Sequence, residues 1–89
     1  MATPELFMKA SPNPFASSNT ITYHVETKSK MQLIVYDASG RKVSVLLDKE
    51  QEAGTYTLPW NSGSNPKGSY YISAFKNGVL KQTISVVKQ

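Results

Sequence analysis

The chain has 89 residues, 39% of them hydrophobic, and its ten lysines and arginines outnumber its six acidic residues, giving a net charge of +4. A chain this short forms one domain with a small core, and with no cysteine and one histidine it offers neither disulfides nor a thiolate or paired-histidine metal site. Because the positive residues are scattered and no apolar run could span a membrane, we expect no nucleic-acid partner, no cofactor and no membrane-spanning segment.

The first distinctive stretch is SPNPF, residues 11–15. Pro12 and Pro14 fix the φ angle at about −65° and have no N–H to donate, so this stretch is extended and cannot lie within a central strand. We expect a stiff lead-in to the first fully paired strand, preceded by a short strand at residues 5–10.

Beyond this stretch, apolar and polar residues alternate with a period of two, and no window keeps the spacing of a helix. Together with the short strand at residues 5–10, the alternation predicts seven strands, which is typical of an all-β, immunoglobulin-like antiparallel β-sandwich. The six further strands are predicted at residues 20–26, 30–37, 41–47, 55–60, 69–76 and 79–88.

Turn residues separate these strands. DASG at 37–40 favours a type I turn, and NG at 77–78 favours a type I′ hairpin turn. The polar run 48–54 and the loop 61–68 are expected to be surface connections. The residues predicted to face the core are Ile21, Tyr23, Val25, Met31, Leu33, Val35, Val43, Val45, Leu47, Tyr56, Leu58, Trp60, Tyr70, Ile72, Ala74, Ile84 and Val86.

The titratable residues do not converge on a catalytic site. His24 falls on the polar face of a strand, and Asp37 and Asp48 flank turns, where their side chains serve as turn formers. Glu50 and Glu52 lie in a polar connection without the fixed scaffold that a pair of catalytic carboxylates needs. We therefore expect no enzymatic activity.

Five pieces in order, SPNPF, TITYHV, LIVYDASGRKV, AGTYTLPW and PKGSYYISAFKNGVLKQTISVVK, together resemble a known family. They closely resemble the type A C-terminal sorting domain of the type IX secretion system, a relative of the immunoglobulin-like domain of flagellar hook-capping proteins. The resemblance covers residues 11–89, which we take as the sorting domain, with residues 1–10 as a linker, a first short strand or a non-native start.

The resemblance implies a non-catalytic tail of a larger protein, whose N-terminal cargo enters the periplasm on a signal peptide that this chain does not contain. The secretion machinery at the outer membrane then recognises the tail. A sortase-like protease commonly removes it as the cargo is anchored to the cell surface or released outside the cell. The positions that match the family's motifs are Pro12, Asn13, Pro14, Gly40, Arg41, Gly54, Gly68, Tyr70, Lys81, Val86, Val87 and Lys88.

The last strand, residues 79–88, is expected to be both a structural strand and the export address. If it lies at a sheet edge, its unpaired main-chain groups stay open to a strand of a receptor.

An immunoglobulin-like accessory module that binds carbohydrate or protein is the alternative function. Such a module needs an exposed aromatic surface, and Ile34, Tyr36, Tyr71 and Phe75 are expected to share the outer face of one sheet. This patch could dock the secretion machinery, a glycan or a second copy of the domain, or it could reflect ordinary cross-strand pairing.

Overall fold

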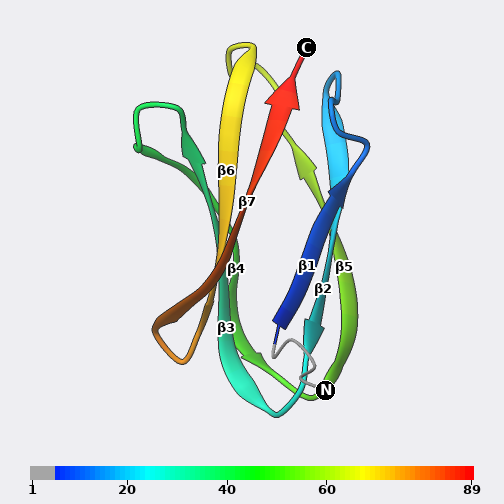
Figure 1. Cartoon of the computed structure of the whole chain (residues 1–89), viewed down its shortest axis with the longest axis vertical. Helices are drawn as coiled ribbons and strands as arrows, with labels where there is room; N and C mark the ends of the chain where they lie inside the picture. The colour runs from blue at the N-terminus through cyan, green and yellow to red at the C-terminus, as the bar shows by residue number, and fades with distance from the viewer. Residues whose placement is uncertain (1–5) are drawn as a thin grey trace, which may run out of the picture.

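The computed structural model describes residues 6–89, and it confirms the all-β sandwich (Figure 1). Two antiparallel sheets pack face to face, one in the order β1-β2-β5 and the other in the order β4-β3-β6-β7. No helix long and apolar enough to cross a membrane occurs in residues 6–89. The seven strands are β1 (Leu6–Ser11), β2 (Ser18–Val25), β3 (Ser29–Asp37), β4 (Lys42–Gln51), β5 (Gly54–Asn61), β6 (Gly68–Lys76) and β7 (Val79–Lys88).

The core lies between the sheets, where alternate residues of each strand meet. Most of the predicted inward residues are buried there, whereas Val43, Leu47, Tyr56, Leu58 and Ile84 are partly buried at its margin. The fully enclosed cluster consists of Met8, Phe15, Ile21, Tyr23, Val25, Met31, Leu33, Val35, Trp60, Tyr70, Ile72, Ala74 and Val86.

The prediction that Val45 faces the core is wrong, because β4 contains a β-bulge. Leu33 pairs with Leu47, but the next residue of β3, Ile34, pairs with Val45, which leaves Leu46 as the extra residue. One extra residue moves the following side chains to the other face of the sheet. Val45 is therefore on the outer face and 48% exposed, while Leu46 packs against the core in its place.

The polar run that was expected to be a connection is mostly strand. β4 continues to Gln51 and β5 begins at Gly54, so only residues 52 and 53 connect the two sheets. Asp48 and Glu50 pair across the ladder with Gln32 and Lys30 of β3. The sequence pattern of this run is that of a loop because this end of β4 is exposed and its charged side chains face water.

The hairpin between β6 and β7 has the expected backbone. Asn77 has a φ of 51° and Gly78 a φ of 84°, as the type I′ turn requires at its two central positions. The side chain of Asn77 also accepts a hydrogen bond from the Lys30 N–H at 2.9 Å, which links the hairpin to the start of β3.

Candidate recognition site

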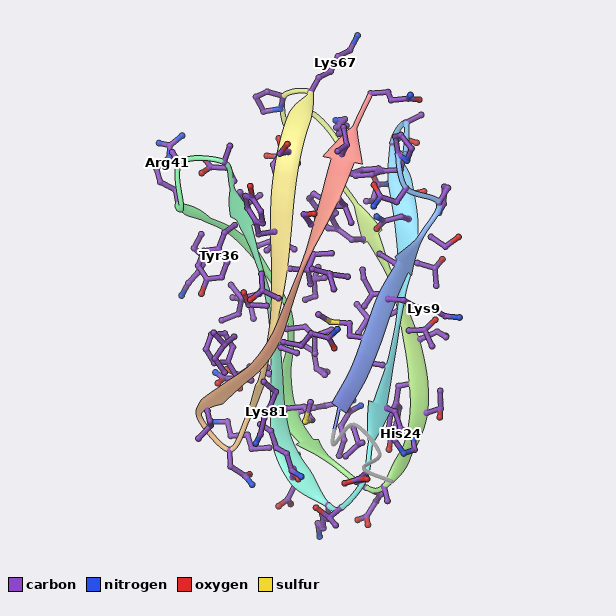
Figure 2. The ribbon with its side chains drawn as sticks, viewed as in Figure 1. Lys9, His24, Tyr36, Arg41, Lys67 and Lys81 are labelled. Carbon is purple, nitrogen blue, oxygen red and sulfur yellow. The ribbon has the colours of Figure 1, made fainter. Side chains whose placement is uncertain are left out.

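The motif positions gather at one end of the sandwich, except for Gly54 and Lys81. This end, hereafter the C-terminal end, consists of residues 12–15, the turn 37–41 with the start of β4 to residue 43, the loop 61–68 with the start of β6 to residue 70, and residues 85–89 (Figure 1). Figure 2 shows Arg41 and Lys67 there, with Lys81 toward the opposite end. The structure therefore brings together pieces that are up to about seventy residues apart in the sequence, as the hydrogen bonds of Asn13 to β7 show.

The SPNPF stretch covers the outer edge of β7. The side-chain amide of Asn13 donates to the Ser85 carbonyl oxygen at 3.2 Å, and the Val87 N–H donates to the Asn13 Oδ1 at 3.0 Å. The main chain of Phe15 then donates to the Val87 carbonyl oxygen at 2.9 Å and accepts from the Gln89 N–H at 2.8 Å. The expectation of an open edge is thus wrong for the last residues of β7, because the domain's own N-terminal segment occupies it.

The composition of the stretch follows from this contact. Pro12 and Pro14, each preceded by a cis peptide bond, have no N–H and lie exposed on either side of Asn13. The side chain of Asn13 carries both a donor and an acceptor, so it can occupy the place of a backbone amide group at the edge of a sheet. A proline-flanked asparagine therefore caps the edge without continuing as a strand.

Phe15 anchors the stretch from inside. Its side chain is 1% exposed, and its ring lies 5.4 Å from that of Trp60. Trp60 in turn meets the ring of Tyr70 edge-on at 5.3 Å, an arrangement that aromatic pairs prefer. These three rings close the C-terminal end of the core.

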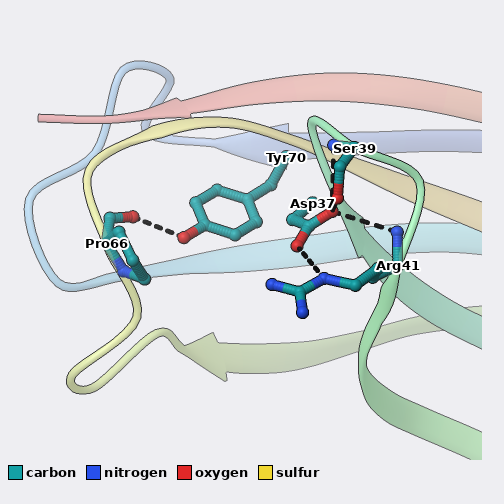
Figure 3. Close-up of polar contacts among 5 residues, drawn as sticks. All are labelled: Asp37, Ser39, Arg41, Pro66 and Tyr70. Atoms are coloured by element: carbon teal, nitrogen blue, oxygen red, sulfur yellow. Dashed lines mark hydrogen bonds and ion pairs between the residues drawn. The ribbon is translucent and has the colours of Figure 1, made fainter.

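Tyr70 also holds the loop that precedes β6. Its hydroxyl donates to the carbonyl oxygen of Pro66, four residues upstream (Figure 3). A tyrosine near the start of a strand that binds the preceding loop in this way is the tyrosine corner of immunoglobulin-like domains. The Gly68-x-Tyr70 motif is thus a structural corner, with Gly68 at a φ of 138°.

Lys88 is an internal residue although it is next to the last position. It is only 8% exposed, and its ammonium group donates to the carbonyl oxygens of Gly63 at 2.9 Å and Asn65 at 2.6 Å. Val86 is fully buried, whereas Val87 is 44% exposed. Lys88 therefore ties the loop 61–68 to the end of β7, and of these three terminal positions Val87 alone presents a large apolar surface.

The turn between β3 and β4 is organised by Asp37. Its Oδ1 accepts hydrogen bonds from the Ser39 hydroxyl at 2.6 Å and from the Arg41 N–H at 3.0 Å, and its Oδ2 lies 3.3 Å from the Arg41 Nε. Gly40 has a φ of 89°, which a residue with a side chain rarely adopts, and its N–H donates to the Asp37 carbonyl oxygen. The predicted type I turn is thus closed by a glycine and fixed by one carboxylate.

This hydrogen bonding makes the turn sensitive to acid. The Ser39 hydroxyl, followed by the Arg41 N–H, lowers the pKa of Asp37 from 3.8 to about 2. Because the folded pKa lies below the unfolded one, the carboxylate contributes its full stability above about pH 4 and loses it as the pH falls toward 2. We expect the stability difference between the wild type and Asp37→Asn to shrink over that interval, as measured by urea denaturation.

Asp48→Asn is the matched control for this pH series, because it removes an exposed carboxylate whose ion pair with Lys30 spans 3.7 Å. Its stability difference from the wild type should be small throughout. A gap between the wild type and Asp37→Asn that stays constant from pH 5 to about pH 2 would contradict the role of the turn.

The turn and the loop enclose a pocket. It has a volume of about 480 Å³ and lies between Asp37–Val43 on one side and Asn65–Tyr70 on the other. In Figure 3 the Arg41 guanidinium extends from the turn toward Pro66, on the same side as the Tyr70 ring. The motif residues Arg41, Gly68 and Tyr70 all line this pocket.

Comparison with protein families decides the identity of the chain. Residues 9–89 match the family described as a secretion system C-terminal sorting domain. The chain belongs to this family. No curated protein sequence matches it. The family is that of the type IX secretion system, and its sorting role implies export to the cell surface or the extracellular space.

The predicted docking patch of the sorting domain lies on the outer face of the larger sheet. Tyr36 and Tyr71 are direct cross-strand partners in β3 and β6, and Ile34 and Phe75 lie on the same face. The expectation that all four are exposed is wrong for Ile34, which is only 8% exposed, whereas Tyr71 is 40% exposed. The exposed part of the patch is therefore aromatic, and Ile34 is covered by its neighbours.

Two motif positions lie away from the C-terminal end of the sorting domain. Gly54 begins β5 at a φ of 154°, a backbone conformation that residues with a side chain rarely adopt. Lys81 is exposed on β7 beside the bulge that follows Leu80. Gly54 has a structural reason for its position, and Lys81 belongs to a different surface from the pocket.

Sequence reasoning missed Phe15, Lys42 and Lys67 as parts of the C-terminal end. Phe15 follows a proline and stands outside any alternating segment, so only its hydrophobicity hinted at burial. The two lysines read as scattered charge because the turn and the loop that carry them are distant in the sequence. Among residues 6–89, no three histidine, cysteine, aspartate or glutamate side chains gather to hold a metal ion.

Proposed function

We propose that this sorting domain directs an attached cargo protein from the periplasm across the outer membrane through the type IX secretion machinery. A sortase-like protease then removes the domain as the cargo is anchored or released. The observation that carries this proposal is the family match over residues 9–89, which includes all seven strands apart from the first residues of β1.

The domain performs no catalysis in this proposal. Four of its described carboxylates support this, because they are used in a turn or in surface ion pairs. Asp37 is committed to its own turn, and Glu50 and Glu52 lie 3.7 and 3.5 Å from the Lys28 ammonium on an exposed surface. None of them is aligned with a nucleophile or a second acid, which a hydrolytic site would require.

The address is a folded surface and not a linear peptide. Supporting this, Val86 and Lys88 are buried, and the edge beside them is covered by Asn13 and Phe15. A receptor that approaches the C-terminal end meets Val87 and the pocket around Arg41 together. Because this surface exists only when both ends of the chain are in place, recognition also reports that the domain has folded.

A reporter fusion tests the sorting role. The whole chain is attached to the C-terminus of a periplasm-directed reporter in a host that has the type IX system. The intact fusion should reach the cell surface or the medium. Versions that lack residues 79–89 or carry Gly68→Pro should stay in the periplasm, because the first removes β7 and the second forces a φ of about −65° where the corner needs 138°.

The control is the same intact fusion in a host whose type IX translocon has been inactivated, where the reporter should remain periplasmic. Reporter activity in the periplasmic fraction shows that the retained fusions are made and that their reporter part is folded. Equal export of the intact and truncated fusions, or export without the translocon, would refute the sorting role.

A further inference from the structure

We infer that the pocket between the turn 37–41 and the loop 65–70 binds a carboxylate on an acidic segment of a protein partner, with Arg41 as the principal contact. The inference deepens the proposed function and rests on it in one respect, since the partner is taken to belong to the secretion machinery. The binding itself can be tested separately from export.

The guanidinium of Arg41 has one internal contact and is otherwise open to such a ligand. Its Nε faces the Asp37 Oδ2 at 3.3 Å, while the side chain as a whole is 84% exposed. Among residues 6–89, no other carboxylate contacts it, and Arg41 lines the pocket, so its two terminal nitrogens are available to a ligand bound there. Paired N–H groups of this kind match the two oxygens of a carboxylate.

The charge around the pocket is unbalanced. Lys42 and Lys67 line it together with Arg41, and neither lysine makes an ion pair within the described part of the chain. Asp37 is the one carboxylate in the lining, and three hydrogen bonds from the turn already occupy its Oδ1. An anion bound in the pocket is therefore attracted by three cationic side chains. The one acidic side chain in the lining is already hydrogen-bonded within its own turn.

The opposite end of the sandwich differs. The other described acidic residues lie there or on the strands leading to it, where Lys28 and Lys30 form ion pairs with three of them. Positive charge is thus in excess at the C-terminal end, where Asp37 pairs with Arg41 alone, and is largely compensated at the other end. An acidic partner is drawn to the end that carries the family's motifs.

The form of the site favours a protein segment over a membrane surface. Binding to anionic lipid typically requires about four to eight lysines and arginines spread over a face. Here three cations surround one concavity whose lining includes Val43, Pro66 and Tyr70. A pocket of about 480 Å³ with one principal hydrogen-bonding group accommodates a glutamate or aspartate side chain together with part of its backbone.

The test is an NMR titration of the isotope-labelled domain with a blocked hexaglutamate peptide, with inorganic phosphate in a parallel titration. We expect peptide-induced shifts at the amides of Arg41, Lys42 and the loop 65–70. Arg41→Gln should weaken peptide binding by about tenfold or more, because it removes charge-assisted hydrogen bonds. Arg41→Lys, which keeps the charge but not the fork, should bind between the two.

Lys9→Gln is the matched control, since it removes the same charge from an exposed position on β1, away from the pocket (Figure 2). Its affinity should equal that of the wild type at low salt. Thermal melts establish that Arg41→Gln is folded, which is expected because the Asp37 Oδ1 keeps its bonds from Ser39 and from the residue 41 N–H.

The outcomes separate the alternatives. Shifts spread over all lysines, or equal weakening by Lys9→Gln, overturn the site. Phosphate binding without peptide binding overturns the protein partner in favour of a phosphate-bearing ligand. If Arg41→Gln loses peptide binding but its reporter fusion is exported like the wild type, the pocket has no part in sorting, whereas failure of the intact fusion refutes the sorting role itself.

Discussion

Replacing Trp60 with alanine is expected to lower the free energy of unfolding by about 3–5 kcal/mol, a large share of the roughly 5–15 kcal/mol that a domain possesses. Trp60 is 3% exposed, and its ring touches both Phe15 and Tyr70. Its removal leaves a cavity where the two sheets and the N-terminal segment meet. Urea denaturation of the purified domain measures the change.

Tyr71→Ala is the matched control for this substitution, because Tyr71 is also a strand aromatic but is 40% exposed on the outer face. It should cost far less. If Trp60→Ala lost under about 1 kcal/mol, or no more than Tyr71→Ala, the central place of Trp60 in the core would be wrong.

Phe15→Ala is expected to cost about 3–5 kcal/mol as well, and to release the cover from the end of β7. Phe15 is 1% exposed, and its main chain binds both Val87 and Gln89. Without the buried ring, the segment loses its anchor, although its hydrogen-bonding groups remain. Compared with the wild type, the Phe15→Ala variant should therefore show faster deuterium exchange at the amides of Val87 and Gln89. This acceleration should be larger than any at the amides of the central strand β3.

Phe75→Ala serves as the control, since Phe75 is a partly buried ring on the outer face of β6. It should leave the exchange of the Val87 and Gln89 amides unchanged relative to β3. Uniform acceleration across all strands in Phe15→Ala would mean that the segment has no separate role and unfolds only with the whole domain. Because Phe15 and Trp60 are in contact, the double variant should lose less than the sum of the two single losses.

A surface assembled from both ends of the chain suits the proposed sorting role. In that role the cargo is joined ahead of β1, and β1 leads directly into the segment that covers β7. The proposed binding pocket is formed by the turn after β3 and the loop before β6, and Lys88 ties this loop to β7. A substitution that disturbs one of these segments should therefore also alter the surface that the other segments form.

The amino-acid sequence by itself determined the fold class and most of the inner face. In β2 the apolar residues alternate with polar ones, and in β3 and β6 one alternate set of positions is apolar throughout, so residues such as Ile21 and Ile72 are inward by local geometry alone. The turns at 37–40 and 77–78 were likewise predictable, because the aspartate side chain bonds to the backbone two residues on, and asparagine and glycine adopt the positive φ angles that such turns need. The ordered motifs were sufficient to indicate the family.

Only the tertiary structure decided the rest, because it depends on partners far away in the sequence. The bulge at Leu46 became visible only from its register against β3, and it reversed the prediction for Val45. The hydrogen bonds of Asn13 to β7 join residues 72 and 74 positions apart, a separation at which no local pattern specifies contact. For the same reason the sequence gives no sign that Lys88, although charged, is buried with its ammonium group bonded to the carbonyl oxygens of Gly63 and Asn65.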